Sequence, residues 1–507
     1  MKKTMKILAS KLKFTLVCFV FVLLILFLPI SQISAEQHLK SALDSYVETF
    51  LEEHRIPGAS IALVHENRTV YLKAWGITGE SKEIVTTETP FTIGSISKSL
   101  TGLAIMRLIE EGTIRLDDPV QKYLPWFTLK DNQAASQITL KHLLTQTSGI
   151  STYSGLSISD REAKDLNAIR ENVERLSKIK LTAAPGEKHQ YSNANFLILG
   201  ALIEEVTNQT YSEYMEEQVF SPLGMNDAAA DYSTALKKGY AAGYQSWLGI
   251  PRNSAVTYDN GGAPYGYLTT SARDMVQYIK WLSLHESNHN FLSEETMNLY
   301  MNPYVQTGEH RFYGLGVRIS NPDTEEEMIW HSGSTPDSHA EVFFIPATGW
   351  GGVILTNKNH IFEEKGLIYL KQGIINILNG DEPVDIPRSS PIVQVILIGI
   401  ISLLLVLSIY LLVRIQSRKT GKSNSWRITG MLQLAVSIAI IPVLVYSTGA
   451  PWHTIKVFAA DVALLTKIIV ILMALNGVLS IYISSKDLRK TIKRTGLRNP
   501  VKTVYRS

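Results

Sequence analysis

The sequence predicts an α+β domain followed by three helices long enough to cross a membrane. Strand-like runs stand at both ends of residues 36–380, and the stretch between them shows mostly helix and loop patterns. A sheet built from the two ends of a domain, with helices inserted between them, belongs to the α+β class. Residues 391–485 then contain three apolar runs of bilayer-spanning length.

The predicted domain begins with an amphipathic helix over residues 38–53. Residues 59–64 and 69–72 follow as a strand pair around a polar turn, because both runs are rich in aliphatic and β-branched residues. The later elements are three strands and a closing amphipathic helix: strands over 314–319, 341–345 and 352–356, and the helix over 363–378. Residues 381–390 contain prolines and acidic residues and are predicted to be a linker.

The N-terminus has the pattern of a secretory signal peptide. Five lysines precede an apolar run over residues 14–30, and small residues follow it up to Ala35. We expect cleavage after Ala35, with an uncleaved anchor helix as the alternative. The only cysteine, Cys18, lies in this run, so the mature chain would have no disulfide and no cysteine ligand.

Three apolar runs are predicted to span a membrane: residues 391–413, about 428–446 and about 459–483. Lysines and arginines cluster between the first two runs and again after the third, whereas the connection between the second and third has one lysine. The positive-inside rule then puts the first connection and the basic tail, 486–507, in the cytoplasm. Three spans place residues 36–380 on the extracytoplasmic side, which a signal peptide also requires.

Two charged residues, Asp461 and Lys467, fall in or near the third run. We expect them to lie near a membrane interface or to pair with each other, and a polar path through the membrane is the alternative. A single span would be enough to anchor the domain, so the presence of three also suggests a lateral entry route for an amphiphilic substrate.

Charge is divided unevenly along the chain. The whole chain carries +3, but residues 36–380 carry −13, which argues against nucleic acid as a partner. Seven histidines of the domain show no metal-ligand spacing, and we expect no metal and no cofactor: His54, His65, His142, His189, His310, His339 and His360.

Ser95 and Lys98 stand three residues apart, where a short strand-like run turns into an apolar helix. Residues at this spacing share one helix face, one turn apart. A helix N-terminus favours developing negative charge, and a desolvated lysine can hold or remove a serine proton. The alternative is an N-cap serine beside an exposed lysine.

Two later motifs, Tyr191-Ser192-Asn193 and His331-Ser332-Gly333-Ser334, follow in chain order. Together with the Ser95 motif they resemble the serine hydrolase family of class C β-lactamases, D-Ala-D-Ala carboxypeptidases, D-aminopeptidases and related esterases. Three surrounding phrases support the resemblance: residues 142–150, 221–225 and 266–270. It covers residues 40–380 and implies an antiparallel sheet flanked by helices, an all-helical lobe beside it, and a site between them.

The resemblance assigns the chemistry to three side chains. Ser95 is the expected nucleophile, Lys98 keeps its proton mobile, and Tyr191 is the expected general base for acylation. A tyrosine of ordinary pKa, about 10, is a poor base at neutral pH, so the nearby ammonium is needed to favour the phenolate. The alternative for Tyr191 is a loop aromatic that closes the helix after it.

Asn193, His331 and Gly333 are expected to bind substrate. Asn193 would donate its amide to the substrate carbonyl, with an N-cap role as the alternative. His331 would assist the base or, when protonated, bind a carboxylate, with a hydrogen-bonded sheet histidine as the alternative. The motif that begins at His331 contains no permanently charged side chain. Gly333 lets substrate lie against the strand edge, and the N–H groups of Ser95 and Ser334 would form the oxyanion hole.

The implied function is a membrane-anchored extracytoplasmic serine hydrolase that acts through an acyl-enzyme on amide bonds next to D-amino acids. The alternatives are a penicillin-binding cell-wall protein or weak β-lactamase, a prodrug-activating D-amino-acid peptidase, and a catalytically idle membrane sensor. Asn193 and Thr335 depart from the pattern of the prodrug-activating branch. The expected partners are a small peptide, D-amino-acid amide or β-lactam-like substrate, and the membrane.

Overall fold

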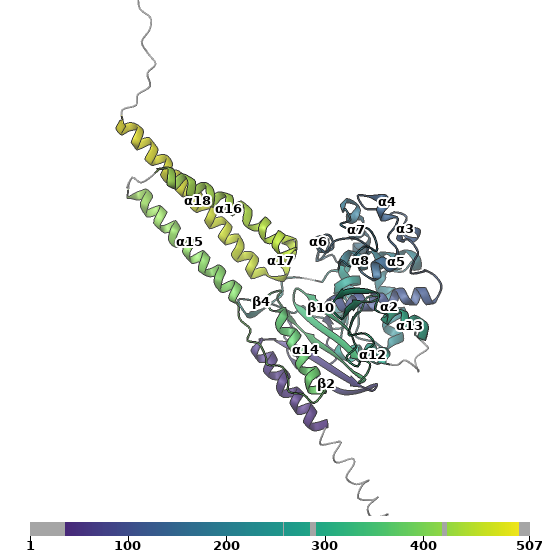
Figure 1. The fold of residues 1–507 in the computed structure, drawn as a ribbon. Helices are drawn as coiled ribbons and strands as arrows, with labels where there is room; N and C mark the ends of the chain where they lie inside the picture. The colour runs from purple at the N-terminus through teal and green to yellow at the C-terminus, as the bar shows by residue number, and fades with distance from the viewer. Residues whose placement is uncertain (1–35, 257, 284–290, 418–422, 496–507) are drawn as a thin grey trace, which may run out of the picture. The chain divides into compact units, whose positions relative to one another are not determined.

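The computed structural model describes residues 36–256, 258–283, 291–417 and 423–495 (Figure 1). The predicted signal peptide and the end of the predicted basic tail lie outside the described residues. The chain divides into two compact units, one of residues 36–55 with Lys365–Ser389 and one of Ile56–Glu364 with residues 390–495. The domain limits at residues 35, 380 and 390 stay predictions.

The small unit pairs a helix over residues 36–53 with α14 (Glu364–Leu378), so both predicted amphipathic helices are confirmed. The Tyr46 hydroxyl donates to the Tyr369 carbonyl at 3.0 Å. Gly373 allows the close approach, because a Cβ there would lie 2.2 Å from the Tyr46 ring.

The large unit is built on an eight-stranded sheet with the order β2-β1-β12-β11-β10-β9-β8-β7, in which each neighbouring pair is antiparallel. Its strands are β1 (Gly58–His65), β2 (Arg68–Gly76), β7 (Val305–Gly308), β8 (Arg311–Tyr313), β9 (Arg318–Ser320), β10 (Met328–Thr335), β11 (Ser338–Ile345) and β12 (Trp350–Thr356). Strands from the two ends of the domain meet where β1 pairs with β12, which confirms the predicted α+β class.

One predicted strand is largely wrong. Of residues 314–319, only Arg318 and Ile319 belong to β9, and the preceding residues turn the chain from β8 into β9. Gly316 has φ of +103°, a backbone conformation that an extended strand does not contain.

The stretch between β2 and β7 is mostly helical, as expected, with two small additional sheets. These sheets are formed by β3 (Phe91–Thr92) with β6 (Thr269–Thr270), and by β4 (Tyr244–Trp247), β5 (Ile250–Asn253) and β13 (Lys358–Asn359). The α-helices are α2 (Ser97–Glu110), α3 (Val120–Tyr123), α4 (Asn132–Ala135), α5 (Leu140–Leu144), α6 (Thr152–Ser157), α7 (Ala168–Glu174), α8 (Asn193–Thr207), α9 (Tyr211–Met215), α10 (Ser221–Leu223), α11 (Tyr232–Lys237), α12 (Ala272–Ser283) and α13 (Glu294–Met301). Short 3-10 turns are η1 (Gly94–Ile96), η2 (Arg175–Lys178) and η4 (Asn260–Gly262), and π turns are η3 (Glu216–Phe220) and η5 (Ala263–Tyr267).

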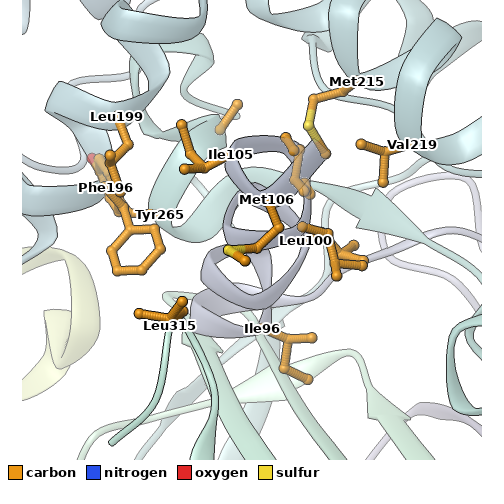
Figure 2. Close-up of a cluster of buried hydrophobic side chains, with 14 of the residues drawn as sticks. Ile96, Leu100, Ile105, Met106, Phe196, Leu199, Met215, Val219, Tyr265 and Leu315 are labelled. Carbon is orange, nitrogen blue, oxygen red and sulfur yellow. The ribbon is translucent and has the colours of Figure 1, made fainter. Parts of the chain in front are cut away.

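Helix α2 is the central element of the helical part. Its residues from Ser97 to Met106 are all buried, so it has no solvent face over its first turns. Figure 2 shows Leu100 and Met106 in this core, with Phe196 of α8 and Leu315 nearby. Because α2 is packed on all sides, it holds the residues at its N-terminal end, including Ser95 and Lys98, in a rigid position.

Three long apolar helices follow the sheet: α15 (Ile392–Gln416), α16 (Ser423–Thr448) and α18 (Ala460–Thr495). Segments of 25, 25 and 26 residues in them are long and apolar enough to cross a membrane, which supports the three predicted spans. Both α15 and α16 pack against α18 (Figure 1). A short helix, α17 (Trp452–Phe458), connects α16 to α18.

Candidate active site

Ser95 and Lys98 stand at the junction of η1 and α2. Ser95 lies in the 3-10 turn and Lys98 in the first turn of the α-helix, where it is fully buried. The Lys98 ammonium donates to the Ser95 Oγ at 2.9 Å and to the Tyr265 carbonyl at 2.7 Å. The alternative of an N-cap serine with an exposed lysine is therefore wrong.

Tyr191 lies in the loop before α8, beside this pair. The Lys98 Nζ is 4.9 Å from the centre of the Tyr191 ring. Burial by itself would raise the pKa of Tyr191, but the positive charges of Lys98 and Arg318 outweigh it and hold that pKa below its ordinary value. Burial also lowers the pKa of Lys98, against the attraction of the Tyr191 phenolate. Both shifts make the proton shared by these groups easier to move near neutral pH.

Asn193 is the first residue of α8, and Ser192 holds the N-cap position. The Asn193 side chain donates to the Ser159 Oγ at 3.1 Å. The alternative in which Asn193 caps the helix is therefore wrong. The hydroxyl of Ser159, in the loop after α6, therefore orients the Asn193 amide.

The C-terminal end of β10 lies directly against η1. Gly94 has φ of +52°, and a Cβ there would lie 2.2 Å from the Ser334 nitrogen. A Cβ on Gly333 would lie 1.9 Å from the Ile93 carbonyl oxygen and 2.8 Å from the Ser95 nitrogen. The two glycines thus let the backbone N–H groups of Ser95 and Ser334 approach each other, which is the arrangement an oxyanion hole requires.

His331 is buried in β10 with its ring 6.4 Å from that of Tyr191. Its Nδ1 lies 2.7 Å from the Ser332 carbonyl oxygen. Since a carbonyl only accepts, Nδ1 carries the proton, and Nε2 is then an acceptor in the neutral ring and a second donor in the protonated ring. The Tyr313 hydroxyl is 3.5 Å from Nε2, a long contact. His331 is therefore a hydrogen-bonded histidine of the sheet that stands beside Tyr191.

Arg318 is a site residue that the sequence motifs did not indicate. It pairs with Trp330 across β9 and β10, and its guanidinium carbon is 5.1 Å from the Tyr191 ring centre and 5.5 Å from that of Tyr313. Its Nε is buried and has no hydrogen-bond partner among the described residues. Burial and then the Arg318 charge lower the pKa of His189 to about 4. A fixed positive charge therefore stands beside the predicted base, where the third motif supplies none.

Asp160 is a second residue that the motifs missed. It is buried, and the Tyr267 hydroxyl donates to its Oδ1 at 2.7 Å. Burial raises its pKa to about 6, and the Tyr267 hydrogen bond and the Lys98 charge oppose this rise. The sequence signal was weak, because residues 158–160 belong to no periodic element.

Among the described residues, no group of three or more His, Cys, Asp or Glu side chains stands close enough to hold a metal ion. The chain does contain one H-E-x-x-H sequence, from His285 to His289, which lies outside the described residues.

The three motifs follow one another along the chain and meet at one site. Residues 43–372 match the family whose sequence model is described as Beta-lactamase. The chain belongs to the β-lactamase family. It is therefore a serine hydrolase by family and by fold, whereas the roles of the individual side chains stay predictions.

Similar sequences include proteins with two different names. Protein flp of Staphylococcus aureus (strain MW2) is 29% identical over 343 residues, which are 66% of this chain and 66% of that protein. A protein named Beta-lactamase from Escherichia coli (strain K12) is 27% identical over 363 residues, 65% of this chain and 92% of that protein. The chain thus matches about two thirds of the length of the flp relatives.

Two solved structures share the family fold. The octameric penicillin-binding protein homologue from Pyrococcus abyssi has a TM-score of 0.57 and 28% identity, over 67% of this chain and 77% of that one. The D-alanine carboxypeptidase AmpC from Burkholderia cenocepacia has a TM-score of 0.56 and 22% identity, over 68% of this chain and 99% of that one. The predicted β-lactamase and DD-peptidase type of fold is confirmed.

Proposed function

We propose that this protein is a membrane-anchored, extracytoplasmic serine peptidase that cleaves amide bonds next to D-amino acids through an acyl-enzyme on Ser95. One observation carries the proposal: buried Lys98 bonds to the Ser95 hydroxyl while it lies against Tyr191, whose pKa is lowered. A sensor or scaffold needs no such activated hydroxyl, because binding alone uses no proton transfer.

The proposed reaction has two halves. In acylation, the Ser95 Oγ attacks the substrate carbonyl and its proton passes to the Tyr191 phenolate, with Lys98 stabilising the charge that moves. The negative oxygen of the tetrahedral intermediate is bound by the N–H groups of Ser95 and Ser334. The C–N bond then breaks, and Tyr191 returns the proton to the leaving amine. In deacylation, water attacks the ester carbonyl and gives a proton to Tyr191, the bond between the acyl carbon and the Ser95 Oγ breaks, and Oγ takes that proton back.

Arg318 extends the proposal to the kind of substrate. A guanidinium is permanently charged and binds carboxylates in a fork geometry. Arg318 is half-buried and its guanidinium carbon lies 5.1 Å from the Tyr191 ring centre, so it places a fixed positive charge beside the proposed base. We therefore propose that the substrate carries a carboxylate near the scissile amide, as a peptide with a C-terminal D-amino acid does. The D-configuration itself rests on the motif resemblance.

The membrane side of the proposal is supported by the three apolar helices and the distribution of basic residues. A single cysteine in place of exposed Glu309, in a Cys18→Ser background, tests it. A membrane-impermeant maleimide should label this cysteine in intact cells. Labelling only after the cells are broken open would contradict the extracytoplasmic assignment.

The experiment that tests the reaction is intact-protein mass after incubation with a penicillin, for the wild type and Ser95→Ala. The same samples are given N-acyl-D-Ala-D-Ala and its C-terminal amide. We expect Ser95-dependent cleavage that prefers the free carboxylate. A long-lived penicillin adduct without cleavage would favour a penicillin-binding role, and neither adduct nor cleavage would favour the idle sensor.

A further inference from the structure

Helix α17, which connects two of the apolar helices, contacts the loop beside the proposed active site. The His453 Nε2 donates to the Asp160 carbonyl oxygen at 2.7 Å. Ile455 of α17, with Ala450 and Ala463 on either side of the helix, forms a buried apolar cluster. Leu156 of α6 packs against this cluster, so α17 contacts the loop through a polar group and the helix before it through apolar groups.

The contacted loop holds two groups of the site. Ser159 accepts the hydrogen bond from the Asn193 amide, and the Asp160 carboxyl accepts one from Tyr267. Asp160 also has φ of +57°, a left-handed conformation that is strained for a residue with a side chain and needs neighbouring contacts to persist. The bond to His453 is one of those contacts, and it is made by the peptide group that follows this unusual torsion.

A second set of contacts holds the start of α18, directly after α17. Asp461 is buried, with its Oδ1 2.9 Å from the His360 Nε2. Its Oδ2 accepts hydrogen bonds from the Leu248 N–H at 2.9 Å and from the Gln394 amide at 3.1 Å. These partners replace the Lys467 pairing that the sequence suggested. A buried carboxylate with this many partners resists displacement, because each lost bond leaves a desolvated polar group.

We propose that α17 is a positioning element of the active site, in which His453 fixes the loop of Ser159 and Asp160 and thereby the Asn193 amide. This inference rests on the proposed role of Ser95 as nucleophile. The helical bundle then acts on catalysis for every substrate, including small soluble ones. If the bundle were only a membrane anchor, substitutions in α17 would leave the catalytic rate unchanged. If it were a lateral entry route, they would change the rate only for amphiphilic substrates.

The test uses the full-length protein in detergent micelles and a fluorophosphonate probe that reports acylation of the catalytic serine. The serine oxygen forms a bond to phosphorus, fluoride leaves, and the serine proton passes to Tyr191 and from there to solvent. We expect His453→Ala to lower the second-order labelling rate about tenfold, because small misplacements of positioned groups slow reaction strongly. His453→Gln keeps an N–H donor and should recover most of that rate. His310→Ala, at an exposed histidine, is the matched control.

Asp461→Asn tests the same inference through the second contact, with Glu309→Gln as its control at an exposed carboxylate. We expect slower labelling at a temperature well below the melting temperature of the variant, and kcat rather than KM should fall with a small peptide substrate. Wild-type rates in both His453→Ala and Asp461→Asn would overturn the inference. Equal labelling of Ser95→Ala and wild type would instead overturn the proposed nucleophile, so the two failures are distinguishable.

Discussion

The Lys98 ammonium lies 2.9 Å from the Ser95 Oγ and is completely shielded from solvent. An ammonium in this position costs desolvation free energy that the Ser95 and Tyr265 contacts only partly offset. Such a cost is typical of a group that is retained for chemistry.

Replacing Lys98 by methionine should leave the fold intact, because an apolar chain of similar length fits a buried site. Fluorophosphonate labelling of Ser95, followed by intact-protein mass against time, should slow by a factor of about 100 or more, the range of a lost proton-transfer group. Lys122→Met, at a solvent-exposed lysine of α3, is the control and should react at the wild-type rate. Fast labelling of Lys98→Met would remove the lysine from the mechanism.

Arg318→Ala should change the pH dependence of acylation. The Arg318 charge favours the phenolate, so its removal raises the pKa of Tyr191 toward the ordinary value. The rising limb of the plot of rate against pH should therefore move to higher pH. The fluorophosphonate rate is the suitable measurement, since that probe has no carboxylate. Arg318→Lys keeps a charge and should keep the rising limb of the rate profile near its wild-type pH. If the limb stays at the wild-type pH in both variants, Arg318 does not influence the base.

The same variant should also change substrate preference. Wild type should cleave a peptide with a free C-terminal carboxylate faster than its amide, and Arg318→Ala should lose about 10- to 100-fold of this preference, the value of a charge-assisted hydrogen bond. The ratio of kcat/KM for the two peptides measures it. A ratio that stays constant would place carboxylate recognition elsewhere.

Gly333→Ala should abolish acylation. The added methyl group would lie 1.9 Å from the Ile93 carbonyl oxygen, which is backbone and cannot turn away, so β10 must separate from η1. The oxyanion donors then move apart. Gly308→Ala, on β7 with no atom closer than 3.9 Å, is the control and should keep full activity. Circular dichroism should show both variants folded.

Asp274 gives a prediction about stability. Burial, with the Asp227 charge adding to it, raises its pKa from 3.8 to about 7. The folded protein therefore binds a proton that the unfolded chain releases, and stability is lost as pH rises from about 4 to about 7. Asp274→Asn should raise the melting temperature at pH 8 and leave it unchanged at pH 3.5. An equal effect at both pH values would show that the carboxyl is not the cause.

Much of the fold was predictable because its signals are local. The β1–β2 pair, the helices at 36–53 and 364–378 and the three apolar helices each carry their own periodicity or composition. The strand over 314–319 was misplaced because its glycines form a turn, and aliphatic residues around a turn resemble a strand.

The sequence by itself determined that Ser95 and Lys98 share one helix face and that Tyr191 and Gly333 belong to motifs of the same family, since spacing and order are properties of the chain. Only the tertiary structure decided that Arg318 and His453 lie beside this site. Arg318 arrives through the register of β9 on β10, and His453 through the packing of α17 on a loop nearly three hundred residues earlier. Neither residue has a local signal, because long-range register and packing arise from the free energy of the whole fold and not from neighbours in sequence.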